Sequence, residues 1–170
     1  MSKRFVVGVM GSGREEWQPY SAQIGTLIAE LGFNLLTGGG GGTMTAVARA
    51  FCEVPNRKGI SIGIVPTERD RIGLYSIKAG YPNQWVELTI SSPLGTFIDG
   101  DDLMPTRNHI NIMSSDTLVI LPGNKGTANE VALARLYEKT MFFFGPKDTL
   151  PVNERNASHM IDDVCSFLVG

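Results

Sequence analysis

The stretch FVVGVMGSG, from Phe5 to Gly13, decides the fold class of this 170-residue chain. Phe5–Met10 is a continuous apolar run, as expected for a strand that is buried on both faces of a parallel sheet. The run ends directly at the turn Gly11-Ser12-Gly13. A buried strand followed by a glycine turn is typical of the first unit of an α/β protein.

Strand-length apolar runs alternate with segments of helical period along the rest of the chain. The pattern predicts strands over Asn34–Thr37, Ile60–Val65, Trp85–Ile90, Thr117–Leu121 and Met141–Phe144, and helices over Tyr20–Leu31, Met44–Val54, Asp102–Met113, Ala128–Lys139 and His159–Val169. We therefore predict one domain over residues 1–170 with a Rossmann-like, three-layer α/β fold, in which helices cover both faces of a mostly parallel sheet.

The middle third of the chain has the weakest pattern. We expect Pro66 to end the third strand, and the segment from Arg69 to Asp102 to be mainly loops, because it is rich in Gly, Pro, Ser and Asp. Its length and position suggest a lid or an enlarged pocket wall.

The composition limits the classes of binding partner that this protein can have. Fifteen basic and seventeen acidic residues give a net charge of −2, so the basic patch needed for nucleic acid is not indicated. No apolar run is long enough for a membrane span. Lys3 and Arg4 lead straight into the first strand without a signal-peptide stretch, and Cys52 and Cys165 are isolated. These features favour a cytoplasmic protein.

Three glycine-rich loops each follow a predicted strand. Because ligands of open α/β sheets bind beyond the carboxyl ends of the strands, these loops are the candidate site. Glycine allows close approach of the backbone, and N–H groups at a helix start favour an anion, so we expect a phosphate-bearing ligand. The candidate residues are Gly11, Ser12 and Gly13 in the first loop, Gly38, Gly39, Gly40, Gly41, Gly42 and Thr43 in the second, and Pro122, Gly123, Asn124, Lys125, Gly126 and Thr127 in the third.

Several ligands are disfavoured. Glu16 stands where a dinucleotide fingerprint has its third glycine, and no acidic residue ends the second strand, which argues against NAD. Neither of the first two glycine loops ends in the Gly-Lys-Ser/Thr of a P-loop. No spacing of His, Cys, Asp and Glu predicts a metal site, and His109 and His159 are assigned to helix surfaces or local hydrogen bonds.

The third loop continues into the most specific motif of the chain. LPGNKGTANE, from Leu121 to Glu130, preceded by Arg107, resembles the PGGxGTxxE motif and upstream arginine of the Lonely Guy superfamily of cytokinin-activating phosphoribohydrolases. The glycine run followed by Met44 resembles a second motif of that superfamily. Some members have been labelled lysine decarboxylases, but no pyridoxal phosphate site is recognisable here, and we reject that activity.

The resemblance implies roles for two residues. Superfamily enzymes cleave the N-glycosidic bond of nucleoside 5′-monophosphates, so Glu130 would bind ribose or stabilise an oxocarbenium-like transition state, and Arg107 would orient the phosphate or the glutamate. The residues alone also fit structural roles. Thr127 to Glu130 has the pattern of a capping box with Thr127 as N-cap, and Arg107 could be a solvated charge paired with Asp101 or Asp102.

The chain departs from those enzymes at Asn124 and Lys125, which replace a glycine and its neighbour, and at Asn108, which follows Arg107 in place of lysine. The string RNHINIMSS, from Arg107 to Ser115, instead resembles a segment of the molybdenum-cofactor carrier proteins, with Asn108 and Asn111 at its polar positions. Those carriers bind a phosphorylated pterin without transforming it.

The resemblance leaves three hypotheses. The preferred one is a carrier of the molybdenum cofactor, with molybdoenzymes as recipients; the others are a phosphoribohydrolase that uses Arg107 and Glu130, and a nucleotide sensor. The family resemblance also implies that the protein is a homodimer or homotetramer.

Overall fold

The computed structural model describes residues 4–95 and 104–170. In this part of the chain eight strands form one sheet with the order β4-β3-β2-β1-β6-β7-β8, and β5 pairs with β3. All pairings are parallel except that of β3 with β4. The strands are β1 (Val6–Met10), β2 (Asn34–Thr37), β3 (Ser61–Arg69), β4 (Tyr75–Ile77), β5 (Leu88–Ser92), β6 (Thr117–Ile120), β7 (Met141–Phe144) and β8 (Ala157–Ser158).

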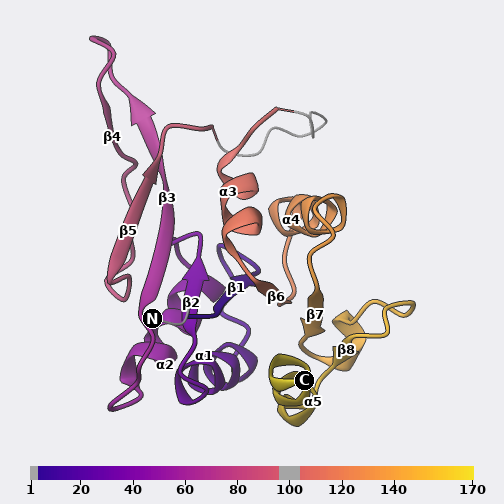
Figure 1. Ribbon diagram of the computed structural model, residues 1–170. Helices are drawn as coiled ribbons and strands as arrows, with labels where there is room; N and C mark the ends of the chain where they lie inside the picture. The colour runs from indigo at the N-terminus through magenta and orange to yellow at the C-terminus, as the bar shows by residue number, and fades with distance from the viewer. Residues whose placement is uncertain (1–3, 96–103) are drawn as a thin grey trace.

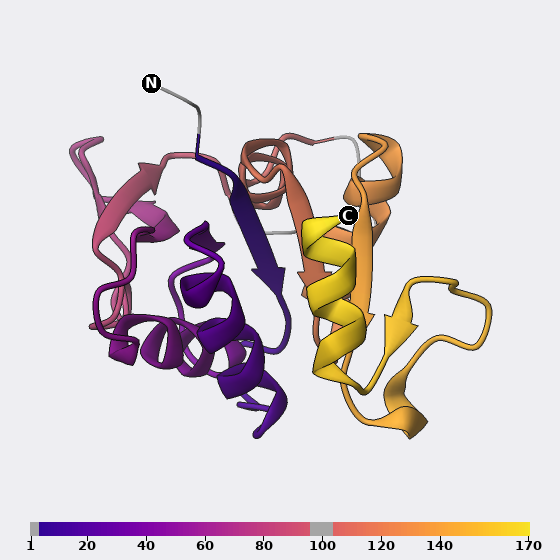
Figure 2. The same cartoon turned by 60° about the horizontal axis from the view of Figure 1, so that its bottom comes forward.

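Helices cover both faces of the sheet (Figures 1 and 2). They are α1 (Tyr20–Glu30), α2 (Thr43–Glu53), α3 (Arg107–Ser114), α4 (Lys125–Leu136) and α5 (Ile161–Val169), with a 3-10 turn η1 at Lys147–Thr149. Helices α1, α2 and α5 lie on one face, and α3 and α4 lie on the other. The fold class predicted from the sequence, a mostly parallel Rossmann-like α/β fold, is confirmed.

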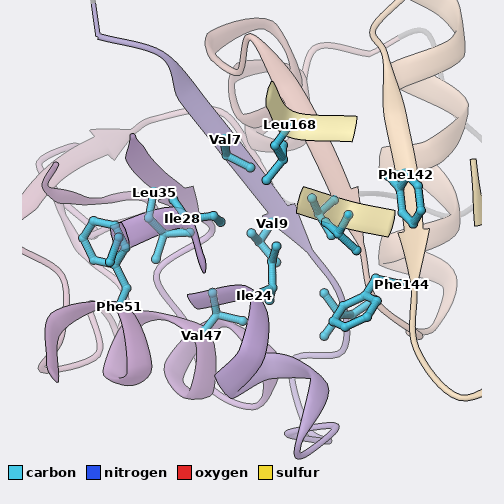
Figure 3. Packing of buried hydrophobic residues seen from close by; sticks show 14 of the residues in the cluster. Val7, Val9, Ile24, Ile28, Leu35, Val47, Phe51, Phe142, Phe144 and Leu168 are labelled. Atoms are coloured by element: carbon cyan, nitrogen blue, oxygen red, sulfur yellow. The ribbon is translucent and has the colours of Figure 1, made fainter. Parts of the chain in front are cut away.

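The two faces of the sheet have separate apolar cores, because neighbouring residues of a strand point to opposite sides. Val7 and Val9 of β1 pack with Ile24, Val47 and other side chains of α1, α2 and α5 (Figure 3). On the other face Met10 packs with Ile112 of α3 and Leu133 of α4. Burial of both faces explains why the central strands β1 and β6 are largely apolar runs.

One strand is longer than predicted. We expected Pro66 to end the third strand, but β3 continues to Arg69. Strand β2 pairs with β3 only as far as Gly63, so the missing N–H of Pro66 removes no bond from that ladder. The carbonyl of Pro66 accepts a hydrogen bond from the N–H of Lys78 at 3.1 Å. The extension pairs with β4, which was not predicted, and the β3–β4 hairpin projects beyond the body of the sheet (Figure 1).

Several other boundaries were wrong. The helix predicted from Asp102 is not helical at residues 104–106 and begins at Arg107, where Thr106 and His109 form a capping box; residues 101–103 lie outside the described part. Strand β5 begins at Leu88 rather than Trp85, since the N–H groups of Trp85 and Val86 bond to Asn83 in a turn. The last helix begins at Ile161 rather than His159, after the unpredicted β8.

Helix α4 begins three residues earlier than predicted, which changes the interpretation of its motif. Its N-cap is Asn124, and Thr127 is the third helical residue. The predicted capping box of Thr127 and Glu130 is therefore wrong. A Cβ on Gly123 would collide with the Thr127 hydroxyl, so Thr127 packs against the loop. The helix ends at Leu136, close to Glu138, which has a left-handed φ of 50°.

Over residues 4–95 and 104–170, no helix is both long enough and apolar enough to cross a membrane.

Candidate functional site

The three glycine-rich loops lie together at the carboxyl edge of the sheet, because β1, β2 and β6 are parallel neighbours. The first loop is the central one. The N–H of Ser12 donates to the carbonyl of Pro122 in the third loop at 3.2 Å, and the carbonyl of Ser12 accepts from the N–H of Thr43 at 2.9 Å. The loops therefore support one another through backbone hydrogen bonds.

A close contact with the backbone of the first loop explains why residue 42, in the second loop, is glycine. Gly42 has a φ of 59°, and a Cβ there would lie 2.5 Å from the carbonyl oxygen of Ser12. The conformation and the contact both exclude a larger residue. Gly42 thus fixes how the first loop meets the start of α2.

The loops enclose a pocket of about 200 Å³. It brings together eleven of the residues predicted from the sequence: Gly11, Ser12, Gly13, Gly38, Met44, Arg107, Asn108, Asn124, Gly126, Thr127 and Glu130. The other predicted residues do not line it: Gly39, Gly40, Gly41, Gly42, Thr43, Asn111, Pro122, Gly123 and Lys125.

Three helices begin around this pocket. Helix α2 starts at Thr43, α3 at Arg107 and α4 at Lys125. The N-cap of α4 makes no side-chain cap hydrogen bond, and the first-turn residues Gly126 and Thr127 line the pocket. The N–H groups of a first helical turn and the positive end of the helix dipole favour an anion at such a position.

Arg107 crosses from α3 to the second loop. Its Nη1 donates to the carbonyls of Gly38 at 2.6 Å and Ile64 at 2.9 Å, and its guanidinium lies 5.7 Å from the ring centroid of Tyr81. Its buried Nε has no hydrogen-bond partner. The prediction that Arg107 is a solvated surface charge is therefore wrong. Its predicted partners, Asp101 and Asp102, lie outside the described residues. Arg107 holds the glycine loop and brings a positive charge to the pocket.

A buried polar layer joins α3 to α4 behind Arg107. The Nδ2 of Asn108 donates to Oδ1 of Asn129 at 3.0 Å, and the Nδ2 of Asn111 donates to Oε1 of Glu130 at 3.4 Å. The buried Oδ1 of Asn111 has no partner. Burial raises the pKa of Glu130 to about 7, although Arg107 and the Asn111 hydrogen bond act to lower it. Glu130 therefore exchanges its proton near neutral pH.

Sequence reasoning missed Tyr81. It lines the pocket from the segment with the weakest pattern, where no motif marks it. The Nδ2 and N–H groups of Asn83 donate to the carbonyls of Gly40 and Gly39 at 2.9 and 2.8 Å. Tyr81 thus makes this part of the Arg69–Asp102 segment a wall of the pocket. The sequence suggests either a pocket wall or a lid for this segment.

A second pocket of about 360 Å³ adjoins the first and shares Asn124 and Thr127 with it. Its wall is mainly apolar and includes Phe143, Phe144 and Leu150. Among the residues that the structure describes, no group of three or more His, Cys, Asp and Glu could hold a metal ion.

Comparisons place the chain among known proteins. An uncharacterised protein of Archaeoglobus fulgidus is 31% identical over 134 residues, which are 78% of this chain and 74% of that protein. The molybdenum cofactor binding protein of the phototrophic bacterium Rippkaea orientalis has a TM-score of 0.72 at 25% identity, over 99% of this chain and 97% of that chain. The molybdenum cofactor carrier protein of Chlamydomonas reinhardtii has a TM-score of 0.72 at 25% identity, over 98% and 96%.

The fold also occurs in a protein with a different ligand. DNA processing protein A from Helicobacter pylori, described for its single-stranded DNA binding mode, has a TM-score of 0.61 at 20% identity, over 96% of this chain and 80% of that chain. At this identity the likeness concerns the fold alone. A family model matches residues 4–165, and the chain belongs to the SLOG cluster4 family.

Proposed function

We propose that this protein binds the molybdenum cofactor, a phosphate-bearing pterin, and carries it to molybdoenzymes without transforming it. The observation that carries the proposal is the convergence of three glycine loops and three helix starts on one pocket beside Arg107. The likeness to two proteins that bind or carry this cofactor supports the same ligand.

The polar groups of the pocket fit such a cargo. The N–H groups at the start of α4 and the positive charge of Arg107, which lines the pocket, favour a phosphate. The molybdenum arrives with the pterin that coordinates it, so the protein needs no metal cluster of its own. In this proposal Ser12, Asn108, Asn124, Thr127 and Glu130 contact the bound molecule.

The size of the site suggests that the ligand extends along the third loop. Pockets for drug-sized ligands usually measure roughly 300–1,000 Å³, whereas the first pocket measures about 200 Å³. The adjoining pocket of about 360 Å³ lies on the other side of Asn124 and Thr127. Together they offer two adjoining compartments to one molecule.

The alternative is a nucleoside 5′-monophosphate phosphoribohydrolase, which Glu130 favours because it lines the pocket. Burial raises the pKa of Glu130 to about 7, so the carboxyl group is partly ionised near neutral pH, and this pKa fits either function. Arg107 uses Nη1 on two backbone carbonyls, which makes it a support of the loop. This use of Arg107 favours binding over hydrolysis.

Other parts of the proposal extend the expectations from the sequence and its family resemblance. We propose a homodimer or homotetramer in the cytoplasm, with no nucleic acid as partner and neither NAD nor pyridoxal phosphate as cofactor. The near balance of fifteen basic and seventeen acidic residues supports the nucleic-acid expectation.

The test is differential scanning fluorimetry of the purified protein with isolated molybdenum cofactor under anaerobic conditions, and with AMP. Products in the same samples are separated by chromatography. We expect the cofactor to raise Tm and AMP to release no adenine. Release of adenine and ribose 5-phosphate, lost in Glu130→Ala, would overturn the carrier proposal in favour of the hydrolase.

A further inference from the structure

Glu130 has few partners in the protein for a buried carboxyl group. Its side chain lies in the pocket wall at 9% exposure. Its hydrogen bond is the 3.4 Å contact from Asn111 to Oε1. Among described residues the salt bridges lie elsewhere, so no cation is within 4.0 Å of Glu130. The acceptor capacity of Oε2, and part of that of Oε1, is open to a ligand.

The rest of the pocket indicates what shape the ligand has. Met44 and Tyr81 line the same pocket, and both pack over Gly40, where a Cβ would lie 2.9 Å from the Met44 methyl group and 2.8 Å from the Tyr81 ring. A thioether beside an aromatic ring forms a soft apolar wall. A flat heterocycle suits such a wall, and its polar edge would then face side chains.

We propose that Glu130 determines ligand specificity by accepting the two adjacent N–H donors of a 2-amino-4-oxopyrimidine ring. Pterins and guanine share this edge, with a ring N–H next to an exocyclic amino group. Two parallel N–H bonds to one carboxylate combine charge assistance with defined geometry. The inference rests on the proposed function, because it assigns the pterin end of that ligand to this pocket.

Two other occupants of Glu130 are less consistent with the site. A phosphate would meet a negative charge here, whereas the start of α4 offers N–H groups. A ribose diol could also donate two hydrogen bonds, but it would not need the apolar wall of Met44 and Tyr81. The diol is therefore the competing outcome that the experiment must separate from the ring edge.

Isothermal titration calorimetry of the wild-type protein with GMP, IMP and AMP distinguishes binding of the ring edge by Glu130 from binding of the ribose diol. The three nucleotides share ribose and phosphate. Hypoxanthine lacks the 2-amino group of guanine, and adenine lacks the ring N–H as well. We expect GMP to bind at least tenfold more tightly than IMP, because loss of one donor leaves a buried acceptor unpaired. Equal affinity for all three would contradict the inference.

Glu130→Gln provides the second measurement. An amide has one acceptor oxygen and one donor NH₂ group, so it cannot accept both donors. We expect its affinity for GMP to fall at least tenfold and that for IMP to fall by less than threefold. Glu30→Gln, at the exposed end of α1, is the matched control and should leave both unchanged. An equal fall for GMP, IMP and AMP would assign Glu130 to the ribose instead.

Titration with molybdenum cofactor separates this inference from the proposed function. If wild type binds the cofactor and Glu130→Gln binds it equally well, the ring-edge role is wrong and the carrier role stands. If wild type prefers GMP over IMP but does not bind the cofactor, the carrier role is wrong and the ring-edge role stands. We expect cofactor binding that is weakened at least tenfold by Glu130→Gln.

Discussion

Glu87 and Glu130 are carboxyl groups in two polar clusters with opposite relations to their surroundings. Glu87 accepts hydrogen bonds from Nη2 of Arg57 and from the N–H of Ser61, each at 2.8 Å. These bonds and the charge of Arg57 lower the pKa of Glu87 despite the opposing effect of burial. Glu130 has one long hydrogen bond, and burial raises its pKa to about 7.

The difference separates a structural cluster from a candidate binding site. Arg57 and Glu87 satisfy each other and connect the end of α2 to the β3–β5 edge of the sheet. Glu130 instead lines a pocket together with Arg107, and its hydrogen bond from Asn111 is long, at 3.4 Å. The arginines do not distinguish the two clusters, since Nε of Arg57 and Nε of Arg107 are both buried without a partner. The two clusters differ in their carboxyl groups, whose pKa values are shifted in opposite directions.

The largest expected effect is on ligand affinity. Arg107→Ala removes a charge and the two hydrogen bonds that hold the second loop, so affinity for the phosphate-bearing ligand should fall about 100-fold, or about 3 kcal/mol. Calorimetric titration measures it. Arg57→Ala is the matched control and should leave affinity unchanged. A similar loss of affinity in both variants would remove the distinction between the two clusters.

The next effect is on stability and has an unusual sign for a glutamate. The folded protein holds the Glu130 proton more tightly than the unfolded chain, so this residue lowers stability as pH rises from about 4.5 to about 7. Glu130→Gln removes that cost and should raise the free energy of unfolding at pH 8 by up to about 3 kcal/mol. Urea denaturation at pH 4 and pH 8 tests it, with a difference expected only at pH 8. Destabilisation at pH 8 would mean that the carboxylate is satisfied within the protein.

Glu87→Gln should have a smaller effect of opposite sign. A lowered pKa contributes stability above the unfolded pKa of about 4.5, and this contribution is lost as pH falls through the folded pKa. Because 39% of the Glu87 side chain is exposed, we expect a loss of only about 0.5–1 kcal/mol at pH 7. The same denaturation series measures it. A larger loss at pH 4 than at pH 7 would contradict the sign.

Lys125 should have the smallest effect. It is exposed at the start of α4, so Lys125→Ala should weaken ligand binding only a few-fold, and less at high salt, because screening reduces the contribution of an exposed charge. Titrations at two salt concentrations measure this. A loss as large as that of Arg107→Ala would place Lys125 in direct contact with the ligand.

The sequence predicted the glycine loops well, because a buried strand that ends at glycine marks its own carboxyl end, and parallel strands bring such ends together. It did not predict which loop residues face the pocket. Gly42 and Gly123 are required by contacts between loops rather than by a ligand. That distinction depends on packing between segments far apart in the chain.

The errors at Thr127 and Tyr81 have physical causes. Thr127 and Glu130 have the spacing of a capping box, but the backbone starts α4 at Lys125 because Asn124 takes the cap position. Tyr81 lies in a segment without periodicity and reaches the pocket through the turn at Asn83. Local patterns record neither the tertiary contact nor the shift of a helix start.

The hydrogen bonds of Ser12 to both neighbouring loops have a consequence for turnover. These bonds join protein to protein, so neither arrival nor departure of a ligand breaks them. Ordering entropy has already been lost on folding, and association spends little of its free energy on arranging the loops. In the proposed carrier role, such a site could be loaded and emptied repeatedly. The time for which the ligand stays bound would then depend on its own contacts with the pocket rather than on rearrangement of the loops.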